Sequence, residues 1–396
     1  MSPTPQRLAT AALKEPTADS AGASALRPKA WAVAAIFAGM AALVFGSVGA
    51  INHRAQPLTY SAAAQDALAT SLAAGGHAAL ADANIDWRSL RVQHIARLSP
   101  APEVVLFGGS RWQEADASAA PGRRFYNAFV TNDFFEDIVA LTTLLHSTGK
   151  LPQTLILSVR FFSVDYLERH DPLWWRLLSS DYRTMSAQLG IPAHSWSNSV
   201  AVGQMSRLLS AETAWTQLRK APWNAPAWQP VATPQHDTLN VVGSDGALRF
   251  SAQHLRTLTP EVVEQDVLDT AAQHRQRRIR IDRPLVAQLG TLIGFLKQQG
   301  VQVVLVQTPF HPSYYRAIQG SPYHDDLLQI EADTRRIAAQ AGARVIGGLD
   351  ALAQGCRSTD FRDFNHASAA CLRQVLVPVS QASQAVGAAP TPASGS

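Results

Sequence analysis

Residues 104–112 read Val-Val-Leu-Phe-Gly-Gly-Ser-Arg-Trp, and this stretch decides the expected fold. A short apolar run is typical of a buried strand in a parallel sheet. The two glycines let the chain turn sharply at the end of the strand, because they have no Cβ atom to obstruct a close approach. We therefore expect Ser110 to be presented at the edge of a sheet, with Gly109 leaving room for a bound group.

Further apolar runs of strand length follow, and helix-period segments lie between several of them. The runs are 124–129, 155–159, 301–306 and 343–346, and the helical segments include 134–145 and 284–299. Strands that alternate with helices predict a mostly parallel sheet covered by helices on both faces. The expected fold class is therefore α/β.

Composition excludes several classes of function. The chain has 396 residues, of which 46% are hydrophobic and 16% charged, and this balance indicates a folded globular body. The net charge of +4 is small and gives little support to nucleic-acid binding. No Walker loop, dinucleotide-binding glycine pattern or zinc-binding helix occurs, so we predict no cofactor and no metal site.

A membrane anchor is expected near the N-terminus. Residues 1–29 are rich in Ala, Pro, Ser and Thr and predict a disordered tail. Ala30 to Ile51 contains no charged side chain and is long enough to cross a bilayer. An excess of cations precedes it, so we expect a cytoplasmic N-terminus, a single pass through the inner membrane and a periplasmic main domain. A cleaved signal peptide, whose apolar core is usually shorter, and a buried soluble helix are the alternatives.

The remaining chain divides into a connector, a main domain and a tail. Residues 52–100 are rich in alanine and predict a helical connector. The main domain, 101–380, is interrupted at about 165–283 by an insertion that holds six of the nine tryptophans. These rings suit sugar or acyl binding, and simple packing is the alternative. Within the insertion, 240–250 predicts a hairpin, and 381–396 predicts a disordered tail.

A second polar motif lies near the C-terminus, where residues 360–368 read Asp-Phe-Arg-Asp-Phe-Asn-His-Ala-Ser. Asp363 precedes His366 by three residues, so its carboxylate can hold the imidazole in one tautomer while the other ring nitrogen takes a proton from a serine. The loop follows the last expected strand, and Ser110 follows the first. Both therefore lie at the carboxyl edge of the sheet, and we expect Ser110, Asp363 and His366 to form a catalytic triad.

Gly108-Gly109-Ser110 together with Asp363-x-x-His366 resembles the SGNH (GDSL-like) hydrolase superfamily, with Gly-Gly-Ser in place of the usual Gly-Asp-Ser. The anchored layout is similar to AlgJ/AlgX-like alginate O-acetylation proteins and DltD-like D-alanyl transfer proteins. The resemblance covers roughly 100–165 and 284–380. It implies a three-layer α/β/α, flavodoxin-like sheet.

The oxyanion hole departs from the family pattern. Family members use a glycine after the second strand and an Asn after the third, and this chain has neither in the expected form. We expect Asn127 to donate beside the Ser110 backbone N–H, and Arg160 to supply a charge. His311 follows the fourth strand and is expected to line the cleft. The alternatives are an Asn that caps a turn and an Arg in a surface ion pair, while Thr131-Asn132-Asp133 falls too early in the chain to supply the Asn.

Cys356 and Cys371 bracket the Asp-x-x-His loop. In an oxidising compartment a bridge between them would steady the catalytic loop, so we expect a disulfide. Two unrelated thiols are the alternative.

Taken together with the resemblance, these features predict a membrane-anchored O-acyltransferase or esterase, and the resemblance implies that it transfers or removes an acetyl group on a cell-envelope or exported polysaccharide. The resemblance further implies a membrane-bound O-acyltransferase partner. The alternative is a non-catalytic glycan-binding or scaffolding component of an envelope polysaccharide assembly complex. A plain esterase or lipase of small esters is a third option.

Overall fold

The computed structural model describes residues 27–55, 62–81, 85–158, 178–192, 210, 215, 228–281 and 283–387. The tail expected at 1–29 lies outside these residues up to position 26, and so do the last nine residues, 388–396. Arg160 and most of the tryptophan-rich stretch between 159 and 227 also lie outside them.

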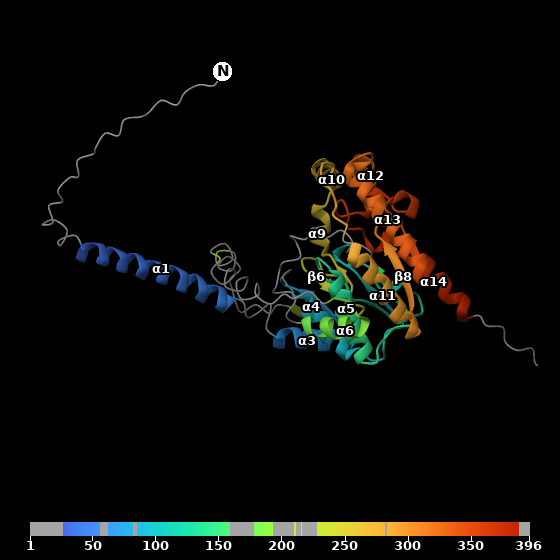
Figure 1. Cartoon of the computed structure of the whole chain (residues 1–396), viewed down its shortest axis with the longest axis horizontal. Helices are drawn as coiled ribbons and strands as arrows, with labels where there is room; N and C mark the ends of the chain where they lie inside the picture. The colour runs from blue at the N-terminus through green and yellow to red at the C-terminus, as the bar shows by residue number, and fades with distance from the viewer. Residues whose placement is uncertain are drawn as a thin grey trace, which may run out of the picture.

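The first helix, α1 (Arg27–Ala55), is the candidate membrane segment (Figure 1). Its part from Trp31 to Ile51 has a mean hydropathy of 2.1, and none of it is buried against the rest of the chain. Large apolar side chains such as Phe37 and Leu43 are exposed along it. The helix is therefore long and apolar enough to span a membrane.

A five-stranded parallel sheet forms the centre of the main domain. Its strand order is β3-β2-β4-β8-β9, and every neighbouring pair runs parallel. The strands are β2 (Val104–Phe107), β3 (Phe125–Asn127), β4 (Thr154–Ser158), β8 (Gln302–Gln307) and β9 (Arg344–Gly347). All five strands expected from the apolar runs are present, and the α/β class is confirmed.

Alternate strand residues belong to two separate hydrophobic clusters. Val105 and Phe107 of β2 pack in the cluster that includes side chains of α5 (Phe135–Ser147) and α11 (Arg283–Gln298). Val104 and Leu106 pack in the other cluster, with α14 (Ala369–Gly387). Because successive side chains of a strand point to opposite faces, the sheet is buried on both faces, as its continuous apolar strands predict.

The connector prediction for 52–100 is wrong in part. The segment contains α3 (Ala62–Ala73) and α4 (Trp87–Arg97), whose leucines pack in the main core, and between them the strand β1 (His77–Leu80). The strand was missed because His-Ala-Ala-Leu has no β-branched or aromatic residue. Its pairing partners lie more than 140 residues downstream.

β1 belongs to a second, antiparallel sheet of order β5-β1-β6-β7. The other strands are β5 (Trp228–Val231), β6 (Asn240–Val242) and β7 (Leu248–Arg249). β6 and β7 form the expected hairpin. Asn127 N donates to Asp245 O in the hairpin turn at 2.7 Å, and Leu248 N donates to Gln113 O at 2.7 Å. The second sheet therefore supports the segment that follows Ser110.

The remaining helices complete the body shown in Figure 1. They are α6 (Ser179–Leu189), α9 (Ala252–Thr257), α10 (Pro260–His274), α12 (Pro312–Ile318) and α13 (Pro322–Ala341). The C-terminal tail was expected from 381, but α14 continues to Gly387, because its Ala, Gln and Ser residues are compatible with helix.

Candidate active site

Ser110 lies where β2 ends, in the short helix η1 (Ser110–Trp112). Close packing leaves no room for a side chain at position 108. A Cβ atom on Gly108 would lie 2.8 Å from Trp112 Cδ1 and 2.9 Å from Ser158 Cβ. The space beside Gly109 is filled by the carboxylate of Asp133, which a Cβ atom would overlap. The room that the sequence predicted at Gly109 therefore holds a side chain of the protein.

The segment around His366 is a tight loop closed by its own backbone. Arg362 N donates to His366 O at 2.8 Å, and Phe361 forms an antiparallel bridge with Ala367. Asp363 Oδ1 accepts from the backbone N–H groups of Asn365 and His366, each at 2.8 Å. These bonds fix the carboxylate, so its second oxygen faces the imidazole.

The structure brings Ser110, His366 and Asp363 together. His366 Nε2 lies 2.8 Å from Ser110 Oγ, and His366 Nδ1 lies 2.6 Å from Asp363 Oδ2. All three residues are partly exposed. The arrangement is that of a serine nucleophile, a base and a carboxylate that orients the base.

Asp363 is held in its charged form. Burial raises the pKa of this carboxyl, but the hydrogen bond and charge of His366 and the two backbone N–H groups outweigh burial, and the pKa lies below the ordinary 3.8. At neutral pH the group is therefore a carboxylate that accepts the Nδ1–H of His366 and leaves Nε2 free to accept a proton.

Asn127 has a different position from the one predicted. Its side-chain Nδ2 donates to Trp112 O at 2.7 Å and to Ala115 O at 2.8 Å, and its Oδ1 accepts from Phe129 N at 3.0 Å. Both amide hydrogens are therefore used inside the protein, and the residue is fully buried. Asn127 positions the segment after Ser110, and its geometry contradicts a role as an oxyanion donor.

His311 does not line the cleft, contrary to the prediction. It is 2% exposed, and its Nδ1 accepts from Ser313 N at the start of α12. Its backbone N–H donates to Phe364 O at 2.9 Å. Burial lowers the pKa of its imidazole. His311 therefore supports the Asp-x-x-His loop from the protein interior. Arg160, the other expected donor, lies outside the described residues.

The turn at 131–133, which falls early in the chain, reaches the site. Asn132 has a left-handed backbone conformation, with φ 50°. Arg88 donates to Thr131 O and Asn132 O at 3.3 and 3.0 Å and forms a buried ion pair with Asp137. These bonds hold the turn so that Asp133 packs against Gly109. The Asn-Asp pair was the available signal in the sequence.

An ion pair that the sequence did not reveal joins the two catalytic loops. Arg362 donates from Nε and Nη2 to the two carboxylate oxygens of Glu114, each at 3.1 Å. Glu114 is buried, and the two residues are 248 positions apart. A two-pronged contact of this kind fixes orientation as well as distance. It holds the loop of His366 against the segment that begins at Ser110.

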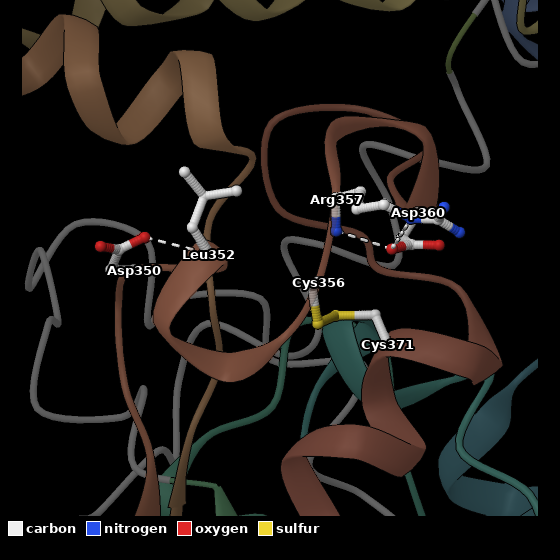
Figure 2. Close-up of a disulfide and its surroundings, with 6 residues drawn as sticks. All are labelled: Asp350, Leu352, Cys356, Arg357, Asp360 and Cys371. Carbon is white, nitrogen blue, oxygen red and sulfur yellow. Dashed lines mark hydrogen bonds and ion pairs between the residues drawn. A yellow bond between two sulfur atoms is a disulfide. The ribbon is translucent and has the colours of Figure 1, made fainter.

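The predicted disulfide is present between Cys356 and Cys371 (Figure 2). It joins the start of the loop to α14, and both cysteines are buried. Asp350 accepts from Leu352 N at 2.9 Å, and Asp360 accepts from Arg357 N at 2.7 Å. The chain just before and just after Cys356 is therefore also held by local hydrogen bonds (Figure 2).

We expect the double variant Cys356→Ala/Cys371→Ala to lose about 3 kcal/mol of unfolding free energy, because the bridge closes a loop of 15 residues. Urea unfolding with and without reductant measures the loss. Reductant should destabilise the wild type and leave the double variant unchanged; equal stability of wild type and variant without reductant would contradict the prediction.

Substitution Gly109→Ala is expected to cost about 1–3 kcal/mol, because the added methyl group overlaps Asp133 and one of the two must move. The segment that carries Ser110 follows Gly109 directly and is expected to shift as well. Gly294→Ala in α11 is the matched control, since its Cβ atom meets nothing within 4 Å. Thermal unfolding compares the two variants, and a Gly109→Ala protein as stable as the control would refute the packing described.

The chain matches no protein-family model and no curated protein. Within the described part of the chain, no group of three His, Cys, Asp or Glu side chains is placed to hold a metal ion. Function is therefore inferred from the geometry of the site.

Proposed function

We propose that this chain is a membrane-anchored serine acyltransferase or esterase of SGNH type, which transfers or hydrolyses an O-acyl group, acetyl in the first instance, on a cell-envelope or exported polysaccharide. The single observation that carries the proposal is the hydrogen-bonded series Ser110, His366 and Asp363. The parallel sheet with apolar clusters on both faces supports the three-layer arrangement that the resemblance implies.

In the proposed reaction, His366 Nε2 takes the proton of Ser110 as Oγ attacks the acyl carbonyl carbon. The tetrahedral intermediate collapses, the bond to the leaving oxygen breaks, and His366 returns the proton to that oxygen. The acyl-Ser110 ester is then attacked by water or a sugar hydroxyl, whose proton passes to His366 and finally to Ser110. Asp363 stabilises the imidazolium in both halves.

The oxyanion donor nearest the reaction is proposed to be the Ser110 backbone N–H, which donates to none of the described residues. A preorganised N–H at the site of developing charge is worth roughly 100-fold or more in rate. Asn127 is committed elsewhere and supplies no second donor.

The anchor proposal rests on α1. The helix is apolar over the length of a bilayer, and Arg27 and Lys29 lie at its N-terminal end. We infer that these cations stay in the cytoplasm and that the catalytic domain lies outside it, in the periplasm. The disulfide agrees with an oxidising compartment.

A fluorophosphonate probe tests the proposed function, because it reacts with serines activated by a neighbouring base. Full-length protein in detergent should be labelled at Ser110, and the His366→Ala variant should not. Absence of labelling in folded wild-type protein that binds glycan would favour the scaffolding alternative.

A further inference from the structure

A groove of about 720 Å³, lined by both polar and apolar side chains, lies next to the segment that follows Ser110. One wall comes from the segment after Ser110, through Glu114 and Asp116, and from Ala369, three residues after His366. The other lining residues come from the β5–β6 connection of the second sheet, from the residue that follows β7 and from α9. The wall residues there are Thr233, Gln235, His236, Asp237, Phe250, Ala252 and Leu255. Pockets of roughly 300–1,000 Å³ hold ligands the size of a short oligosaccharide.

The groove is built from the chemistry that binds sugars. Phe250 lines the groove with a partly buried ring, which packs on His254 with centroids 4.8 Å apart and against the main hydrophobic cluster. Thr233, Gln235 and Asp237 are exposed and supply hydroxyl, amide and carboxylate groups that accept hydrogen bonds from hydroxyls. His236 is committed, since its Nδ1 accepts from the backbone N–H of Thr238 and Leu239.

The charges of the groove oppose an anionic ligand. Its one cation, among the described lining residues, is Arg249, which pairs with Asp245 at 2.8 Å and Asp116 at 3.6 Å. The Glu114 carboxylate is paired with Arg362. Asp237 has no ion-pair partner among the described residues. Carboxylates therefore outnumber guanidinium groups around the groove, and no unpaired cation in the described lining is left to receive a carboxylate or sulfate of the ligand.

We propose that this groove binds the acceptor glycan, and that the glycan segment it takes is uncharged. Sugar hydroxyls donate to Asp237 and Gln235, one ring packs against Phe250, and the bound segment passes Glu114, four residues after Ser110. The inference rests on the proposed function for its catalytic meaning, but binding in the groove is measurable without catalysis.

Calorimetric titration of the full-length Ser110→Ala protein measures glycan binding in the absence of catalysis. The neutral probes are chitotetraose, cellotetraose and mannotetraose, and the anionic probe is tetragalacturonate. At least one neutral tetrasaccharide should bind, Phe250→Ala should weaken it about tenfold, and tetragalacturonate should not bind. Gln340→Ala, in the remote groove between α11 and α13, is the matched control and should bind as the parent does.

Asp237→Lys provides the test of charge, since the added cation should allow tetragalacturonate to bind. The inference is overturned if none of the neutral probes binds at millimolar concentration, if tetragalacturonate binds the parent protein, or if Phe250→Ala has no effect. Fluorophosphonate labelling of wild-type protein reports the proposed function separately. A labelled protein without glycan affinity rejects only the groove, and a glycan-binding protein without labelling rejects only the catalysis.

Discussion

Substitution of Ser110 by alanine is expected to lower acyl transfer by about 10⁴-fold or more while the protein stays folded. The loss follows from the geometry, because Ser110 Oγ is the hydroxyl that lies 2.8 Å from His366 Nε2. Removing it leaves the base with no nucleophile to activate. Folding should be unaffected, since Ser110 is partly exposed and alanine is tolerated at the start of a short helix.

Initial rates of acetyl release from p-nitrophenyl acetate, at equal protein concentration and with matched circular dichroism spectra, give the comparison. Ser118→Ala is a matched control in the next short helix, η2 (Ala117–Ala119). The catalytic role of Ser110 is excluded if the Ser110→Ala and Ser118→Ala proteins turn over at the same rate.

Substitution Asp363→Asn is expected to lower kcat by about 10⁴-fold, because it reverses the tautomer of His366. Two backbone N–H groups hold Asp363 Oδ1, so the single oxygen of asparagine takes that place and its NH₂ group faces His366 Nδ1. The ring must then carry its proton on Nε2, which points at Ser110. A protonated Nε2 cannot accept the serine proton.

Asp360→Asn is the control, since that carboxylate lies in the same loop and accepts from Arg357 N without touching His366. The ¹H NMR resonance of the His366 Nδ1 proton should be present in the wild type and the control and absent in Asp363→Asn. Full activity of Asp363→Asn would show that Asp363 does not set the tautomer.

The strand that presents Ser110 and the loop that presents His366 were predictable because their signals are local. Val104 to Phe107 is uniformly apolar and is followed by two glycines, so consecutive residues indicate both the strand and the point where it ends. The Asp363 to His366 spacing is likewise short. Loops that follow parallel strands lie at the same edge of the sheet, so Ser110 and the loop of His366 could be predicted to lie close together.

What could not be predicted depends on contacts between distant segments. Asn127 was expected at the site because of its place after a strand, but its amide is used by the carbonyls of Trp112 and Ala115, which only the folded chain brings near. Glu114 and Arg362 form an ion pair although they are 248 positions apart in the sequence. β1 has no local strand signal and exists because β5 and β6 pair with it.

The most direct test of the central claim is the mass of the Ser110 peptide after wild-type protein is mixed briefly with p-nitrophenyl acetate and quenched in acid. The proposed reaction predicts a gain of one acetyl group on Ser110, absent in the Ser110→Ala protein and strongly reduced in His366→Ala. An unmodified Ser110 peptide from protein that is turning over the ester, or an acetyl group found only on another residue, would contradict it.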